Sequence, residues 1–222
     1  MTTITQAISH SIPASQSLVW LKQGWQLMRQ APFKLFFVLL LPLVIEGVFQ
    51  LLPAPYGVVL SKWAMAIMAA AIWPIVHHLA TQQSFSLRAI YCSGWGKMIM
   101  LALVMILPAI VQLWTAMALL GSDGIALLLY AEIREVTQLQ LGIIFASATP
   151  LIALIVFAPA RLLLANDSVV AAIRSSIQMV VRAWRPMLVL TMLNVIVLLL
   201  VPFTFVLSAL LTGPWLVCVV YQ

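Results

Sequence analysis

FAPARLLLANDSVVAAIRSSIQMVVRAWRPM, residues 157–187, is the stretch that decides the fold of this chain. It begins with the end of an apolar segment and crosses a charged border at Arg161 and Asp167. A basic, Ala/Ser-rich stretch follows with the periodicity of an amphipathic helix, and Trp184-Arg185-Pro186 leads into the next apolar segment. This succession predicts an interfacial helix between two membrane spans.

The composition is typical of an integral membrane protein. Of the 222 residues, 64% are hydrophobic and 7% are charged, and the mean hydropathy is +1.15, whereas about a quarter of the residues in a soluble domain are charged. A soluble fold of this size would expose much of this apolar surface to water, whereas lipid covers it. We therefore predict an all-α polytopic membrane protein, with a polar tail at residues 1–16 and one integral membrane domain at residues 17–222.

Six apolar segments are candidate spans, since about 20 helical residues cross a hydrocarbon core roughly 30 Å thick. They lie at residues 33–52, 57–77, 98–120, 140–160, 187–202 and 204–221, and would form three hairpins. The last two are either two short spans with a tight turn at Pro202 or one long helix with a re-entrant piece. We favour two spans, because a single helix would be longer than the bilayer is thick.

The distribution of basic residues predicts the orientation. With the N-terminus in the cytoplasm, nine of the eleven Lys and Arg residues fall on the cytoplasmic side. Lys62 and Arg134 fall outside, together with four of the five acidic residues. This bias follows the positive-inside rule and places both termini in the cytoplasm. The same rule explains the net charge of +6, because the basic residues lie singly beside apolar spans and form no patch for nucleic acid.

The spacing of prolines and basic residues predicts a threefold repeat. Pro74 precedes Lys97 by 23 residues, and Pro159 precedes Arg182 by the same number. The unit would be an amphipathic helix on the cytoplasmic side followed by a hairpin, with approximate boundaries at residues 17–82, 83–165 and 166–222. Because prolines are common in membrane helices, coincidence is the alternative.

Three surface helices would open these repeats. In the third, Asn166-Asp167-Ser168 supplies N-capping side chains. Its predicted apolar face comprises Val169, Ile173, Ile177, Val180 and Trp184, and its polar face Arg174, Ser175, Gln178, Arg182 and Arg185. The first copy would have Leu18, Leu21, Trp25 and Met28 on its apolar face. The second, between Leu87 and Met98, is weakened by two glycines.

The motifs Ala158-Pro159-Ala160-Arg161, Ala171-Ala172-Ile173-Arg174-Ser175-Ser176 and Trp184-Arg185-Pro186 carry a family resemblance. In this order they resemble a group of six-span bacterial inner-membrane proteins of unknown function, similar to the membrane domain fused to some glycerophosphoryl diester phosphodiesterases. The resemblance implies a six-span fold in the bacterial inner membrane. It implies no phosphodiesterase activity, because nothing in this chain corresponds to the soluble, metal-binding catalytic domain of those enzymes.

Four arginines form the candidate binding site at the cytoplasmic face. Arg161, Arg174, Arg182 and Arg185 would hold an anionic lipid headgroup or a partner protein, although anchoring by the positive-inside rule also explains them. Arg161 is also expected to pair with Asp167 at the border of the third repeat.

Glu46, Lys62 and Asn194 are the candidate polar residues inside the membrane, where ionisable groups are often functional. Glu46 lies about 20 Å along the first span from Lys34, near the outer interface. Its simpler role there is to pair with Lys62 across the first hairpin, and its functional role would be a proton or cation site. Asn194, Gln112 and Thr191 are expected to bond between helices.

No pattern predicts an enzyme, a cofactor or a metal site. His77 and His78 are adjacent and point about 100° apart on a helix, so they cannot hold one ion from the same face. The leading hypothesis is a non-enzymatic scaffold or accessory subunit that binds membrane lipids, a membrane-protein partner or a second copy of itself. The alternative is a small transporter or lipid-handling protein, with a cavity among proline-broken helices lined by Glu46 or Asn194.

Overall fold

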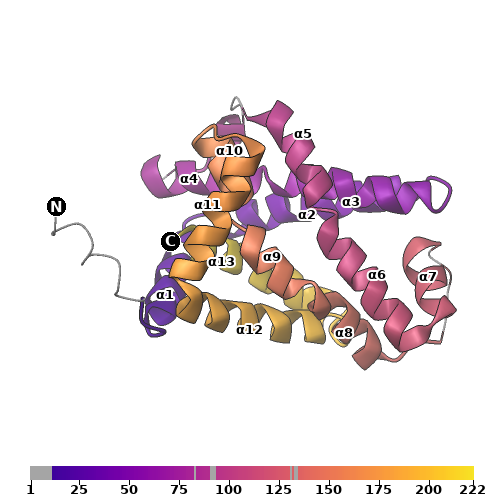
Figure 1. Ribbon diagram of the computed structural model, residues 1–222. Coiled ribbons are helices and arrows are strands. Elements are labelled where there is room, and N and C mark those ends of the chain that lie inside the picture. Colours follow the sequence, from indigo (N-terminus) through magenta and orange to yellow (C-terminus); the bar gives the residue numbers. More distant parts are fainter. Residues whose placement is uncertain (1–11, 83, 91–93, 131, 133–134) are drawn as a thin grey trace, which may run out of the picture.

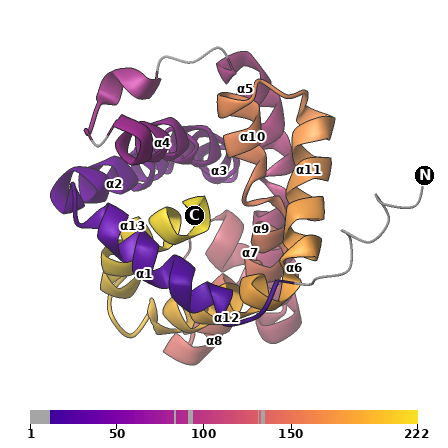
Figure 2. The ribbon, with the colours of Figure 1, turned by 90° about the vertical axis from the view of Figure 1, so that its left-hand side faces the viewer.

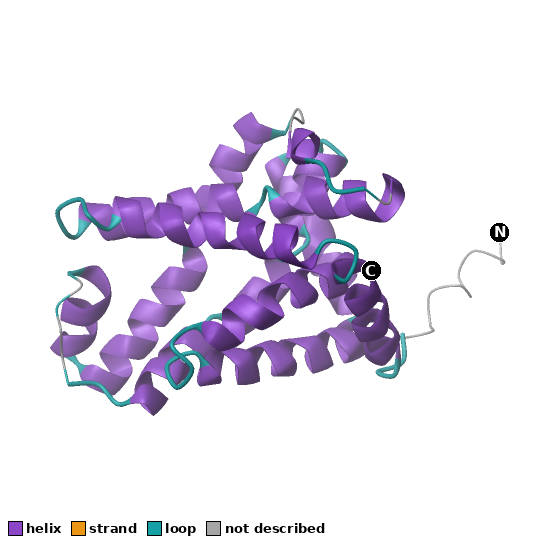
Figure 3. Ribbon diagram, turned by 180° about the vertical axis from the view of Figure 1, so that it is seen from behind, coloured by secondary structure: helices purple, strands orange, loops and turns teal. Residues whose placement is uncertain are grey.

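The computed structural model describes residues 12–82, 84–90, 94–130, 132 and 135–222, and every regular element among them is a helix (Figures 1 and 3). Arg134 and residues 91–93 of the second predicted surface helix lie outside the described residues. The helices in chain order are α1 Gln16–Met28, α2 Pro32–Phe49, α3 Tyr56–Ala69, α4 Ile72–Gln82, the 3₁₀ helix Leu87–Ile90, α5 Trp95–Val104, α6 Leu107–Leu120, α7 Ser122–Leu129, α8 Gln138–Ser147, α9 Thr149–Ile155, α10 Ala158–Leu164, α11 Val169–Arg182, α12 Trp184–Leu200 and α13 Leu207–Tyr221. The predicted all-α fold class is confirmed.

Four helical segments of the described chain are long and apolar enough to cross a membrane. They are Pro32–Phe49, Tyr56–Gln82, Trp95–Leu120 and Gln138–Ile155. The pair α11 and α12 adds a fifth if it is one broken span, although the chain bends by 99° between the two helices. These helices are consistent with a multi-pass membrane protein of four or five candidate spans, and the predicted sixth span is not confirmed.

The last two predicted spans correspond to α12 and α13, which a turn at residues 201–206 separates. The turn includes Pro202, as predicted. The two helices have 17 and 15 residues, and 15 residues rise only about 22 Å, less than a hydrocarbon core of roughly 30 Å. Helix α13 is therefore shorter than the hydrocarbon core is thick.

Prolines mark several of the places where helices begin. Proline occupies one of the first two positions of four helices, at Pro32, Pro108, Pro150 and Pro159. Its fixed φ and missing N–H are tolerated in a first turn, where that N–H has no helical acceptor. Pro42 and Pro214 instead lie inside α2 and α13. The expected breaking of spans by proline therefore holds for some prolines and not for others.

Side chains from neighbouring helices satisfy the backbone at two of these breaks. Between α9 and α10, the buried hydroxyl of Ser176 on α11 donates to the Leu154 carbonyl at 2.8 Å and accepts from the Phe157 N–H at 3.2 Å. Between α8 and α9, Nε2 of Gln112 on α6 donates to the Phe145 carbonyl at 3.2 Å, which confirms the predicted interhelical bond. Such partners are required because hydrocarbon supplies no hydrogen bonds.

Helix α1 packs on α13, so that the two ends of the described chain meet (Figure 2). Their backbones approach closely at Gly24, where an added Cβ would lie 2.6 Å from the backbone nitrogen of Val219. The indole Nε1 of Trp215 donates to the Leu21 carbonyl at 3.0 Å, and the Trp215 and Trp25 rings meet edge to face. Helix α1 thus covers one side of α13, which lies in the middle of the view in Figure 2.

The predicted apolar faces of two surface helices are only partly buried in the protein. Their members Val169, Ile173 and Val180 on α11, and Leu21 and Met28 on α1, are buried or pack against the core. In α11 the buried positions are the small or slender residues Ala172, Ser176 and Val180, whereas Ile177 and Trp184 are exposed. In α1 the buried positions are Ser17, Gly24 and Leu27, whereas Leu18 and Trp25 are exposed. Small residues allow close helix contacts, and large apolar side chains need not be buried in protein when lipid surrounds it.

Two elements differ from the prediction in kind. Of the second predicted surface helix, between Leu87 and Met98, the structure describes the 3₁₀ helix Leu87–Ile90 and the first turn of α5, and no continuous helix joins them among the described residues. Helix α7, which was not predicted, folds back on α6 after Gly121, whose φ of 61° lies in the region that favours glycine. Gly124 allows the contact, since an added Cβ would lie 2.5 Å from the Ala116 backbone.

Gly24→Ala is expected to lower the stability of the protein in detergent, because the new Cβ overlaps the α13 backbone at Val219. Overpacking of this kind costs about 1–3 kcal/mol, which corresponds to a drop in thermal midpoint of several degrees. Gly47→Ala on α2 is the control, since nothing lies within 4 Å of its Cβ position. Equal midpoints for the two variants would contradict the close α1–α13 contact.

Ser176→Ala is expected to destabilise the break between α9 and α10, because it removes the partner of the Leu154 carbonyl and the Phe157 N–H. An unsatisfied buried polar group costs about 1–3 kcal/mol. Ser175→Ala is the matched control, because the Ser175 side chain makes no hydrogen bond with a described residue. Thermal unfolding followed by gel filtration measures both, and an unchanged midpoint for Ser176→Ala would show that the hydroxyl is dispensable.

Candidate functional site

Two adjoining cavities lie among α4, α10, α11, α12 and α13. The outer cavity has a volume of about 550 Å³ and the inner one about 170 Å³. Trp73, Met187, Leu190 and Val220 line both cavities, so these side chains form the boundary between them. The outer volume falls within the range of roughly 300–1,000 Å³ of ligand pockets.

Polar side chains from four helices line the outer cavity between apolar walls, and Gln222 adds another directly after α13. The helical ones are His77 on α4, Arg161 on α10, Arg182 on α11 and Tyr221 on α13. Nδ1 of His77 and the Tyr221 hydroxyl lie 2.8 Å apart, which joins α4 to the end of α13. The four residues come from four helices that are distant in sequence, and the packing of α10 against α4 and α11 brings them together.

The side chains that line the outer cavity carry net positive charge. The Arg161 guanidinium pairs with Asp167 at 2.9 Å through both Nε and Nη2, which confirms the predicted ion pair. Arg182 makes no ion pair or hydrogen bond with a described residue, and no acidic residue is among those that line either cavity. An anion is the charge complement of this mouth, because its two cations share one nearby carboxylate.

The loop between α10 and α11 holds Arg161 in place through three successive side chains. Asn166 adopts a positive φ of 55°, and Lys97 donates to its carbonyl at 2.8 Å and to its Oδ1 at 2.7 Å. Asp167 pairs with Arg161. The Ser168 hydroxyl accepts from the Ala171 N–H at 3.3 Å and caps α11, as predicted. The polar cap therefore fixes the guanidinium at the wall of the outer cavity.

The four predicted arginines do not converge on one site. Only Arg161 and Arg182 line the outer cavity. Arg174 lies beside a shallow apolar groove on the surface of α11, formed with Val170, Ile173, Ile177 and Gln178. Arg185 stacks its guanidinium over the Trp184 ring at 5.4 Å from the centroid. The single headgroup site predicted for all four is therefore divided into a pair that lines the outer cavity and two residues elsewhere on the surface.

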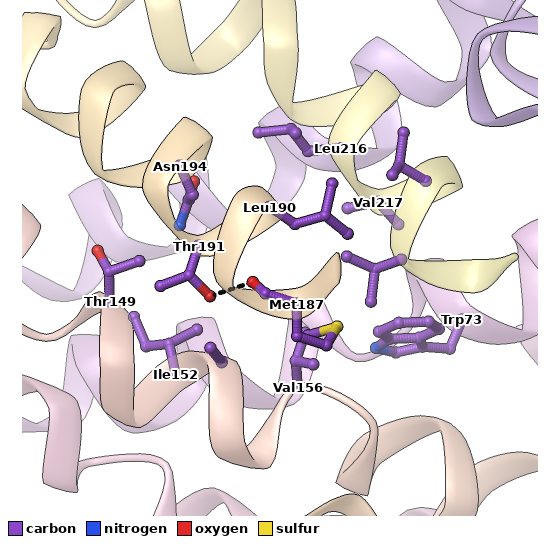
Figure 4. A pocket seen from close by; sticks show the side chains of 13 residues that line it. Trp73, Thr149, Ile152, Val156, Met187, Leu190, Thr191, Asn194, Leu216 and Val217 are labelled. Carbon is purple, nitrogen blue, oxygen red and sulfur yellow. Dashed lines mark hydrogen bonds between the residues drawn. The ribbon is translucent and has the colours of Figure 1, made fainter. Parts of the chain in front are cut away.

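Polar side chains lie at one end of the inner cavity. Figure 4 shows Thr149, Thr191 and Asn194 on one side and Trp73 on the other, with Met187 and Leu190 between them. The Thr191 hydroxyl donates to the Met187 carbonyl at 2.7 Å. The Thr149 hydroxyl is buried and has no partner within the described chain, and Asn194 makes no hydrogen bond to a described residue. The predicted interhelical bonds of Thr191 and Asn194 are thus not found, because the Thr191 hydroxyl bonds within α12 and Asn194 lies in a cavity wall.

Glu46 and Lys62 pair with each other between α2 and α3, as predicted. Glu46 also accepts from Nε2 of Gln50 at 3.2 Å. Neither residue lines the outer or the inner cavity. Glu46 therefore has a structural role between α2 and α3. Of the two residues predicted to line a cavity, Glu46 and Asn194, only Asn194 lines one of these two cavities.

The described residues contain no group of three or more metal-binding side chains. His77 contacts Tyr221, whereas Nδ1 of His78 lies 2.9 Å from the Ser84 carbonyl, so the adjacent histidines have separate partners. The cavity residues Trp73, His77, Thr149 and Tyr221 were missed as site residues. No sequence signal links His77 to Tyr221, which are 144 positions apart.

Comparison of the chain with protein-family models, with curated proteins and with solved structures gives no match. The site is therefore interpreted from its own chemistry, which is a positively charged mouth, apolar walls and an uncharged polar inner end.

Glu46→Gln and Lys62→Gln are each expected to lower the thermal midpoint. The sum of the two single losses should exceed the loss in the double variant, because the double variant leaves no unpaired charge. Each single change leaves one charge of a partly buried pair without its partner, and the side chains are only 15% and 32% exposed. A coupling of about 1 kcal/mol corresponds to roughly 2–4 °C for a chain of this size. A double-mutant cycle measures it, and strictly additive midpoints would contradict the structural role.

Proposed function

We propose that this chain is a lipid-handling membrane protein that binds an anionic amphiphile in the joined cavities. The proposal rests on the order in which three environments follow one another. Two arginines line the outer cavity, aromatic and aliphatic side chains form the boundary, and a smaller cavity lies beyond it. This order matches a molecule with an anionic headgroup and a hydrocarbon part. Of the two functions expected from the sequence, the cavity favours the lipid-handling alternative over the scaffold.

Arg161 and Arg182 suit a phosphate or carboxylate headgroup, because a guanidinium offers several donors in a planar fork. Arg182 is the better contributor of binding energy, since Asp167 already neutralises part of the Arg161 charge. The apolar walls would add about 0.8 kcal/mol for each buried CH₂ group. Headgroup and hydrocarbon would thus both contribute to affinity.

The orientation of the chain that fits this function is the one predicted from the basic residues. In Figure 1, α1, α4 and α11 lie at one end of the molecule, and α7 and the α2–α3 turn lie at the other. We propose that the first end faces the cytoplasm of a bacterial inner membrane, with six spans in three repeated units. The mouth of the outer cavity would then lie at the level of the cytoplasmic headgroups, where anionic lipids carry a negative surface potential.

The exposed face of α11 supports a second function, that of a scaffold on the membrane surface. Its shallow groove combines Val170, Ile173 and Ile177 with Arg174. An amphipathic helix of this kind binds anionic lipid surfaces through apolar area and charge together. It also fits a partner protein or a second copy of the chain. The two functions depend on different arginines of the same helix.

Arg182→Gln is expected to weaken binding of stearate, a single-chain anionic amphiphile, by about tenfold or more, because a hydrogen bond to a charged group contributes about 1.5–3 kcal/mol. Binding of the uncharged methyl ester of stearate should change little. Arg174→Gln on the same helix is the matched control and should leave both affinities unchanged. Titration of the purified protein with each probe, followed by native mass spectrometry, measures the bound fraction.

Equal losses in the Arg182→Gln and Arg174→Gln variants would favour the surface scaffold over the cavity. A stearate affinity that neither substitution alters would contradict both arginine sites. Failure of the unsubstituted protein to bind either probe would contradict the proposed function itself.

A further inference from the structure

Thr149 differs from the other threonines in the described helices. Thr81, Thr115, Thr191 and Thr212 each donate their hydroxyl to the carbonyl four residues earlier, at distances from 2.6 to 3.0 Å. This bond is the usual way in which a helical threonine satisfies its hydroxyl. Thr149 makes no such bond, although it is only 1% exposed. A buried hydroxyl without a partner requires an explanation.

The helix break before α9 explains why the Thr149 hydroxyl has no acceptor on its own helix. The carbonyl four residues before Thr149 belongs to Phe145, and it accepts from Nε2 of Gln112 instead. Thr149 stands at the start of α9, directly before Pro150, where the helix begins anew. The hydroxyl is therefore left without an acceptor on its own helix, on a residue that lines the inner cavity.

Asn194 provides a second, independent group at the same place. It lies two helical turns after Met187 on α12, which is a rise of about 10 Å, and it lines the inner cavity but not the outer one. Its amide makes no hydrogen bond with a described residue. No charged side chain lines the inner cavity. Donor and acceptor groups without charge therefore gather at the end of the cavity farthest from the arginines.

We infer that Thr149 and Asn194 form a polar subsite for an uncharged hydrogen-bonding group that the hydrocarbon part of the ligand carries, such as a hydroxyl, an ester or an amide. This inference rests on the proposed function and specifies its ligand. An unsubstituted hydrocarbon chain would leave the Thr149 hydroxyl and the Asn194 amide without partners. A chain with a polar group at the right depth would satisfy them, and the subsite would discriminate between the two.

The test compares stearate with the positional isomers of hydroxystearate, using the intact chain in detergent and native mass spectrometry. One isomer, or two neighbouring ones, should bind about threefold to tenfold more tightly than stearate, which is the worth of one neutral hydrogen bond. Thr149→Val and Asn194→Leu should each reduce that preference while leaving stearate affinity the same or higher. Thr115→Val, outside both cavities, is the control and should keep the preference.

The outcomes separate this inference from the proposed function. If stearate binds and depends on Arg182, but no hydroxystearate isomer is preferred, the proposed function stands and the polar subsite is overturned. If a preference exists and survives both Thr149→Val and Asn194→Leu, the subsite is also overturned. If neither stearate nor any hydroxystearate isomer binds, the proposed function is contradicted, and the polar subsite with it. Thr149→Ser serves as a second variant, because it keeps the hydroxyl and should retain the preference even if Thr149→Val does not fold.

Discussion

The structure depends on satisfying backbone groups where helices break inside an apolar environment. Ser176 bridges the Leu154 carbonyl and the Phe157 N–H, and it thereby joins α11 to the break between α9 and α10. If α9 and α10 were one straight helix, Phe157 and Arg161 would continue along its axis. Because the break is stabilised from α11, α10 packs against α4, α5 and α11 and presents Arg161 to the outer cavity. One hydroxyl therefore links the backbone, the helix arrangement and the site.

Small residues are the second condition, since they decide which helix faces can meet. Gly24 allows α1 to reach the backbone of α13, and Gly142 does the same for α8 and α12, where an added Cβ would lie 2.7 Å from the Leu199 carbonyl. Large apolar residues such as Phe33 and Phe37 are left exposed, at 78% and 64%. This distribution reverses the rule for soluble proteins and agrees with a lipid solvent, in which burial of large apolar side chains is not the driving force.

The sequence predicts features that depend on neighbouring residues or on strong electrostatics. The Ser168 cap, the Arg161–Asp167 pair and the turn at Pro202 involve residues close in the chain. The Glu46–Lys62 pair is also predictable, because opposite charges near an apolar interface have few other partners. The cavities were not predictable, since Trp73, Met187 and Val220 meet only after three separate parts of the chain have packed. The helix faces were only partly predicted, because apolar periodicity does not distinguish lipid from protein as the apolar neighbour.

The charge balance of the site restricts what it can bind. At the outer end Arg182 lacks a carboxylate partner in the described chain, and at the inner end Thr149 and Asn194 carry no charge. Arg182 is exposed, so an anion beside it would keep both water and a counter-charge, whereas an ion at the uncharged end would lose hydration without gaining a counter-charge. Under the proposed function, the two ends would therefore suit one elongated molecule in a single orientation, with its anion beside Arg182. A molecule charged at both ends would then bind less tightly than one with a single anionic end.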